Sequence, residues 1–148
     1  MMIKKLLFFL AVLLSIPAYA TEYIQPPDSQ RGGARSPGVI TSGGKTIWLS
    51  GHTGDRDSTG KSLAGDFDAQ FRETFRRIDL TLKKAGGSVD NLVSLTFYLT
   101  DPKNLVSAQK LRLEVFKEGR FPATTLVFVS GLPLPEQLIY VSGVAVME

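Results

Sequence analysis

The clearest hydrophobic pattern in the chain lies between residues 66 and 85, where apolar side chains recur at spacings of three and four. This spacing puts them on one face and predicts an amphipathic helix, with Asp66 and Lys84 suited to the two ends of its dipole. A second helix is predicted over residues 104–116. Its buried side is expected to carry Leu105, Ala108, Leu111, Arg112, Val115 and Phe116.

Short runs rich in β-branched and aromatic residues predict four strands. These runs are residues 45–51, 92–99, 123–129 and 138–147. Residues 39–42 are predicted to pair with the first run as a hairpin, because Gly43 and Gly44 favour a turn between them. The predicted order is β-β-α-β-α-β-β, an α/β (α+β) fold with a mixed sheet and both helices on one face.

Alternate residues of the predicted strands fall on opposite faces of the sheet. The face expected to hold the helices carries Ile47, Leu49, Val93, Leu95, Phe97, Leu99, Ile139 and Val141. The other face carries Thr46, Trp48, Ser50, Ser94, Thr96, Tyr98, Tyr140, Ser142 and Val144. A sheet face open to water normally alternates with charged residues, and this one has none. Since no third helix is available, we expect a second subunit to cover it.

The N-terminus has the three parts of a secretory signal. Lys4 and Lys5 precede an apolar run over 6–14, and Ala18 and Ala20 suit the small side chains that signal peptidase reads. The run is shorter than the roughly 20 residues that cross a bilayer, which disfavours the alternative of a retained membrane anchor. We therefore expect export, to a bacterial periplasm rather than full secretion. The predicted domains are a cleaved signal over 1–20, an extended lead-in over 21–38 and one domain over 39–148.

Composition excludes several function classes. Without the predicted signal the chain has 128 residues, with 15 basic and 14 acidic side chains. This balance is not the footprint of a nucleic-acid-binding protein. The sequence has no cysteine and one histidine, which excludes disulfides and disfavours a metal site. No cofactor is expected.

Four motifs, in order and at compatible spacing, resemble the Rid/YjgF (RidA-like, L-PSP) family. They are Ile47–Gly51 (IWLSG), the helix from Gln70 with the strand ending at Tyr98–Asp101, Phe121–Thr125 (FPATT) and Gly131–Pro133. The resemblance runs from about residue 39 to residue 146. It implies a chorismate-mutase-like fold and a homotrimer with ligand clefts between subunits. It also implies imine or enamine deaminase activity on products of amino-acid breakdown; ribonuclease activity, described for some members, finds little support in the near-neutral charge.

Four positions of the family's site differ in this chain. Thr124 stands where active members have an arginine that clamps the substrate carboxylate, and Ser142 stands where they have a glutamate that orients water. Pro37 and Gln109 fall at the positions of a tyrosine and an asparagine. Loss of the arginine predicts weak or absent deamination of standard substrates. The ligand-binding residues that the resemblance implies are Ser50, Gly51, Gln109, Thr124, Thr125 and Ser142.

Other residues are candidates for the missing chemistry, and the catalytic set remains unknown. Arg35 and Arg112 are candidate replacements for the clamp, although a solvated surface arginine is the ordinary alternative. His52 is a candidate general acid or base, since its reference pKa is near neutral; the alternative is a histidine hydrogen-bonded at a strand end. The hydroxyl residues either bind a small polar ligand or bond to neighbouring strands.

The sequence thus predicts an exported Rid/YjgF-like protein with small-molecule clefts between subunits. The first functional hypothesis is an imine or enamine deaminase-type hydrolase acting on an atypical substrate. The alternatives are a trimer that binds a small metabolite without turnover and a chaperone-like trimer. No nucleic acid and no stable membrane anchor are expected as partners.

Overall fold

The computed structural model of the chain describes residues 20–27 and 34–147. The predicted signal peptide therefore lies outside the described residues, except for Ala20. The described elements are β1 (Ala20–Tyr23), β2 (Val39–Ser42), β3 (Lys45–His52), α1 (Phe67–Lys84), β4 (Leu92–Leu99), α2 (Leu105–Val115), β5 (Ala123–Phe128) and β6 (Ile139–Met147), with 3₁₀ turns at Val89–Asn91 and Pro102–Asn104. Within this part of the chain, no helix is long and apolar enough to cross a membrane.

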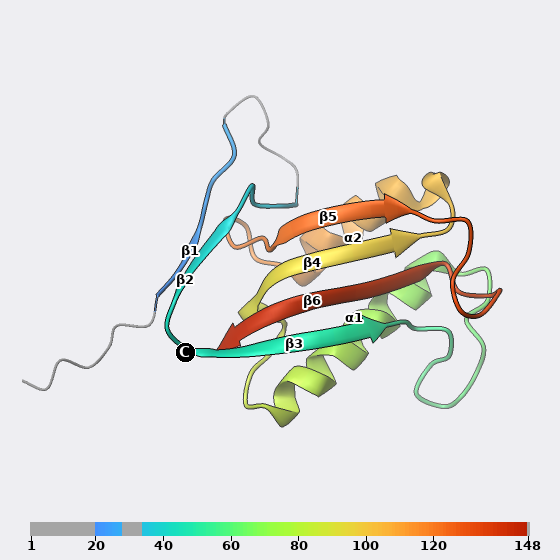
Figure 1. The fold of residues 1–148 in the computed structure, drawn as a ribbon. Helices are drawn as coiled ribbons and strands as arrows, with labels where there is room; N and C mark the ends of the chain where they lie inside the picture. The colour runs from blue at the N-terminus through green and yellow to red at the C-terminus, as the bar shows by residue number, and fades with distance from the viewer. Residues whose placement is uncertain (1–19, 28–33, 148) are drawn as a thin grey trace, which may run out of the picture.

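Four strands form the main sheet, in the order β3-β6-β4-β5. β4 and β5 run parallel, whereas β6 is antiparallel to both of its neighbours. Both helices cover the same face of this sheet (Figure 1). The predicted α+β architecture is confirmed, and the helix and strand bounds match the predicted ranges to within a few residues.

The predicted hairpin between residues 39–42 and 45–51 is wrong. β2 pairs instead with β1, in a separate two-stranded sheet that stands beside the main one (Figure 1). Gly43 and Gly44 do have positive φ angles of 69° and 81°, as a tight turn requires. β3 nevertheless pairs with β6, which offers it a strand of nine residues, whereas β2 has only four.

The core lies between the main sheet and the helices. Phe71 and Phe75 of α1 stack on each other at a centroid distance of 4.8 Å and approach Phe97 of β4 at 6.1 and 6.0 Å. Val93 is buried, as predicted, but it lies outside the main core cluster. A register shift between Leu92 and Ser94 puts Leu92 in the core cluster instead, because an extra residue in a bulge reverses the alternation of faces.

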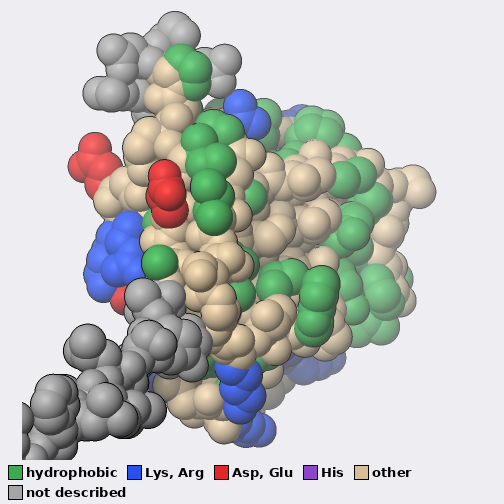
Figure 2. All heavy atoms as spheres, turned by 60° about the vertical axis from the view of Figure 1, so that its left-hand side comes forward, with side chains coloured by type: hydrophobic (Ala, Val, Ile, Leu, Met, Phe, Trp, Pro, Cys, Tyr) green, Lys and Arg blue, Asp and Glu red, His purple; other side chains and the backbone are tan. Residues whose placement is uncertain are grey.

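On the opposite face of the main sheet, no helix of the described residues lies over the strands (Figure 1). Its residues lie in register across the strands: Trp48 opposes Val144, and Thr96 opposes both Ser142 and Thr125. Trp48 is 80% exposed, which is unusual for the one tryptophan of the chain. In Figure 2, where this face lies toward the right, charged side chains are confined to the margins. The structure thus contains the uncovered, uncharged face that the alternation predicted.

The N-terminal half of α1 is fixed to the loops at one end of the sheet. Gln70 is fully buried; its amide donates to the carbonyls of Leu63 and Glu136 and accepts from the backbone of Leu138. Gly54 packs directly against the same turn of helix. A Cβ at Gly54 would lie 2.4 Å from the Gln70 carbonyl oxygen, so the helix can approach this loop only because residue 54 has no side chain.

The substitution Gly54→Ala tests this close approach. We expect it to lower the free energy of unfolding by about 2 kcal/mol, because backbone atoms of α1 must move to admit the methyl group. Gly131→Ala is the matched control, since a Cβ there meets nothing within 4 Å. Denaturant unfolding measures both, and equal stabilities of the two variants would contradict the packing described for α1.

Candidate functional site

The start of β5 is flanked by a segment that lies far from it in sequence. Ser36 forms a parallel bridge with Ala123, and its backbone N–H donates to the Pro122 carbonyl at 3.4 Å. Ala34 and Ser36 are both buried. Residues 34–36 therefore act as a short extra edge beside β5, and they form one wall of the candidate site.

Arg112 of α2 reaches into the space between this segment and β5. Its Nη2 donates to the Thr124 hydroxyl at 2.9 Å and to the Ala34 carbonyl. Its guanidinium carbon lies 5.3 Å from the centre of the Phe97 ring, in cation–π range. One side chain thus connects α2, β4, β5 and the 34–36 segment.

Arg112 is a buried cation without a carboxylate partner among the described residues. The residue is only 5% exposed, and its Nε has no hydrogen-bond partner. Burial, and secondly the nearby charge of Arg35, lowers the pKa of Arg112 to about 10. The side chain therefore still carries its proton at neutral pH. A buried charge held by neutral groups alone has capacity for an incoming anion.

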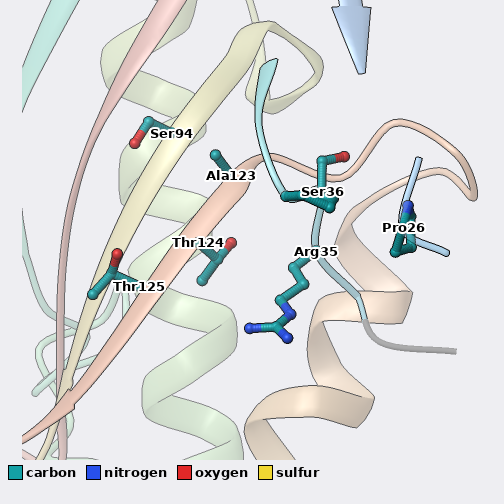
Figure 3. Close-up of a pocket in the computed structure, with 8 residues that line it drawn as sticks. Pro26, Arg35, Ser36, Ser94, Ala123, Thr124 and Thr125 are labelled. Atoms are coloured by element: carbon teal, nitrogen blue, oxygen red, sulfur yellow. The ribbon is translucent and has the colours of Figure 1, made fainter. Parts of the chain in front are cut away.

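Two neighbouring cavities open around these groups. One, of about 390 Å³, is lined by α2, the Ala34–Arg35 segment and β5; its described residues are Ala34, Arg35, Leu105, Gln109, Arg112, Thr124 and Leu126. The other, of about 360 Å³, is lined by Pro26, Arg35, Ser36, Pro37, Ser94, Ala123, Thr124 and Thr125 (Figure 3). Arg35 and Thr124 belong to both, and Figure 3 shows Arg35 extending toward β5. None of the described lining residues is acidic.

Several of the predicted site residues do come together here. Arg35, Gln109, Thr124 and Thr125 line one cavity or the other, and so does Pro37. The hydroxyl of Thr124 also donates to the Pro122 carbonyl at 3.0 Å, so it stands fixed between the backbone and Arg112. The Arg112 guanidinium therefore lies within hydrogen-bond distance of Thr124, the position at which the sequence resemblance leads us to expect an arginine.

Other predicted residues lie elsewhere in the chain. Ser50 and Gly51 are on β3, at the opposite edge of the sheet from β5. Gly51 is a packing residue, because a Cβ there would lie 1.6 Å from the Tyr140 ring. Ser142 lies on β6 opposite Thr96, on the uncovered face. Within a single chain these residues line neither cavity.

His52 is held away from the cavities by two hydrogen bonds. Its Nδ1 lies 2.8 Å from the Ser50 carbonyl oxygen, which can only accept, and its Nε2 lies 3.1 Å from the Thr81 hydroxyl. The ring thus joins the end of β3 to α1. This geometry matches one of the two predicted roles for His52, that of a histidine hydrogen-bonded at a strand end. The other role, general acid or base, stays a prediction, because His52 lines neither cavity of the single chain.

The described residues contain no cluster of three or more histidine, cysteine or acidic side chains that could hold a metal ion. The site is instead cationic and rich in hydroxyl groups. Sequence reasoning missed Ser36 and Ser94, since nothing in the pattern connects them with β5. It named Arg112 only as one of two replacement candidates, although an arginine among the apolar positions of a helix is a signal for a buried, functional charge.

Comparisons with known proteins agree with this fold. A family model described as Endoribonuclease L-PSP matches residues 34–147. A RutC family protein from Aquifex aeolicus is 34% identical over 89 residues, which are 60% of this chain and 70% of that protein. The human 2-iminobutanoate/2-iminopropanoate deaminase is 28% identical over 89 residues, 60% of this chain and 64% of that protein. A crystal structure of a Rid family protein from Yersinia pestis aligns with a TM-score of 0.73 at 22% identity, over 84% of this chain and 97% of that one.

The bond between Arg112 and Thr124 can be tested by an isosteric change. We expect Thr124→Val to lower the free energy of unfolding by about 1.5 kcal/mol or more, because it removes an acceptor from a buried charged donor. Thr125→Val, at the exposed neighbouring position, is the control and should change stability by less than about 0.5 kcal/mol. Urea unfolding distinguishes the two; a neutral Thr124→Val would mean that Arg112 does not depend on this hydroxyl.

Proposed function

This chain belongs to the Rid/YjgF family, described by its family model as Endoribonuclease L-PSP. From that premise we propose that it is an exported hydrolase of the imine deaminase type. Its proposed substrates are small imines that carry a carboxylate. Some members of the family are imine deaminases. Here the carboxylate clamp comes from α2 rather than from β5. Export is proposed on the sequence pattern of residues 1–20.

The observation that carries this proposal is the position of the Arg112 guanidinium. It is bonded to Thr124, the residue that replaces the family's arginine, and it lines a cavity large enough for a small metabolite. A guanidinium offers five N–H donors, and Arg112 uses Nη2 alone in the hydrogen bonds to Thr124 and Ala34. The remaining donors suit a carboxylate, which accepts from two of them at once.

In the proposed reaction the protein binds the imine and orients the attacking water. Water adds to the imine carbon, and the resulting carbinolamine expels ammonia to leave the keto acid. Arg112 would fix the carboxylate and so hold the imine carbon in the cavity. Ser94 and Thr125, which line the neighbouring cavity, offer hydroxyl groups to orient the water.

Assembly would complete this cleft. β3 and β5 are the two edges of the main sheet, and the face between them is uncovered. In the proposed homotrimer, the sheets face inward and the β3 edge of one subunit lies near the β5 edge of the next. Ser50 and Gly51 would then complete the cleft from a neighbouring subunit, which accounts for their absence from the cavities of a single chain.

A second candidate function is the binding of a small carboxylate without turnover. It is favoured by the absence of any Asp, Glu or His among the described residues that line the two cavities. Without such a group, water attack lacks a general base. Ligand-dependent thermal stabilisation with no hydrolysis would identify this function.

Imine hydrolysis by the purified protein is the direct test. Imino acids are generated from small amino acids by an oxidase, and semicarbazide traps the fraction that the protein has not hydrolysed. We expect the natural protein to reduce the trapped fraction. Arg112→Met should lower kcat/KM by roughly 30-fold or more, because the loss of a desolvated charge partner costs about 2 to 5 kcal/mol.

Two further variants serve as controls for this test. Arg112→Lys keeps the positive charge but not the planar fork, and should retain part of the activity if the clamp is electrostatic. Arg72→Gln removes an exposed arginine that pairs with Glu114, and should leave activity unchanged. No turnover by the natural protein on any imine would exclude the hydrolase and leave the binding function.

The proposed trimer has a separate test. Trp48→Glu places a charge on the uncovered face and should convert the assembly to monomers, since a buried unpaired carboxylate costs several kcal/mol. Val106→Glu is the control: Val106 is 75% exposed on α2 and should tolerate the charge. Light scattering gives the mass of each; a monomeric natural protein would exclude the trimer.

A further inference from the structure

The two arginines at the site form a concentration of positive charge that the described residues do not balance. Both side chains line the same cavity, and the charge of Arg35 contributes to the lowered pKa of Arg112. Neither forms an ion pair with a described residue. Two like charges at one cavity repel each other, so a ligand with two negative groups would relieve more repulsion than a ligand with one.

The shape of the site separates the two charges. Arg112 is buried and lines only the cavity beside α2, whereas Arg35 is exposed and lines both cavities (Figure 3). A single compact anion in the cavity beside α2 would leave the second cavity, which Arg35 also lines, unused. An extended molecule could place one end on Arg112 and the other on Arg35, where the two cavities meet at Thr124.

We infer that the ligand of this site is a small dicarboxylate, with one carboxylate on Arg112 and the second on Arg35. Arg35 is then a specificity-determining residue, which selects molecules with a second acidic group. This inference rests on the proposed carboxylate site and narrows it to imines that carry two carboxylates, such as those formed by oxidation of acidic amino acids. The lining hydroxyls of Ser36 and Thr125 suit the polar atoms of such a ligand.

The test compares ligands of matched length by calorimetry, with no need for turnover. Succinate is the dicarboxylate, butyrate the monocarboxylate, and inorganic phosphate the compact anion. We expect succinate to bind the natural protein on the order of tenfold more tightly than butyrate, from one additional charge-assisted contact. Arg35→Gln should reduce the affinity for succinate to about that for butyrate, and should leave butyrate binding unchanged.

The control variant is Arg56→Gln, which removes the same charge from the loop after β3 and should preserve the preference for succinate. Equal affinities for succinate and butyrate, or an equal loss of both in Arg35→Gln, would overturn the inference while leaving the carboxylate site intact. Phosphate binding more tightly than succinate would replace the dicarboxylate with a compact anion. Preference for succinate without imine hydrolysis would support the inference and overturn the hydrolase, whereas no binding of any probe would overturn both the inference and the carboxylate site.

Discussion

The central constraint on this structure is that its main sheet has two faces and the helices of the described residues cover only one of them. α1 and α2 pack on the same side, and there they bury the aromatic cluster around Phe71, Phe75 and Phe97. The other face remains free of charge and carries the exposed Trp48. Burial of apolar surface is worth about 25 cal/mol per Å², so a face of this composition favours association over exposure to water. The proposed trimer and its clefts both follow from this one-sided packing.

The candidate site depends on a second constraint, the burial of one guanidinium. A buried charge needs partners, and Arg112 finds them in a carbonyl, a hydroxyl and an aromatic face from three separate parts of the chain. These contacts hold the 34–36 segment against β5, so the group that would bind ligand also organises the walls around it. The absence of a carboxylate partner among the described residues is what distinguishes this arrangement from a structural ion pair.

The ion pairs at α1 illustrate that difference. Glu73 is buried, and hydrogen bonds from Arg76, with a further contribution from Arg77, hold the pKa of its carboxyl below the ordinary value. Arg77 also binds the Thr53 carbonyl and Asp55, which closes the loop after β3 onto the helix. The charges of this cluster are paired within the chain, so it stabilises the fold. Arg112 and Arg35 form no such pair with the described residues, and this difference supports the proposal that they bind a ligand.

The sequence by itself determined the two helices, the strands of the main sheet and the uncharged face, because these follow from local periodicity and from the pleat. Through its resemblance to the family it also marked Thr124 as a position where an arginine is expected, which stays a prediction. Tertiary structure decided what periodicity cannot encode. β3 pairs with β6, almost a hundred residues away, rather than with the adjacent β2, and a bulge in β4 places Leu92 rather than Val93 in the main core cluster. Arg112 and Thr124, twelve residues apart, met only because α2 packs across the start of β5. In each case, segments far apart in the sequence compete for buried surface and for hydrogen-bond partners. A short window of sequence does not contain the competing segments, so it cannot predict the outcome.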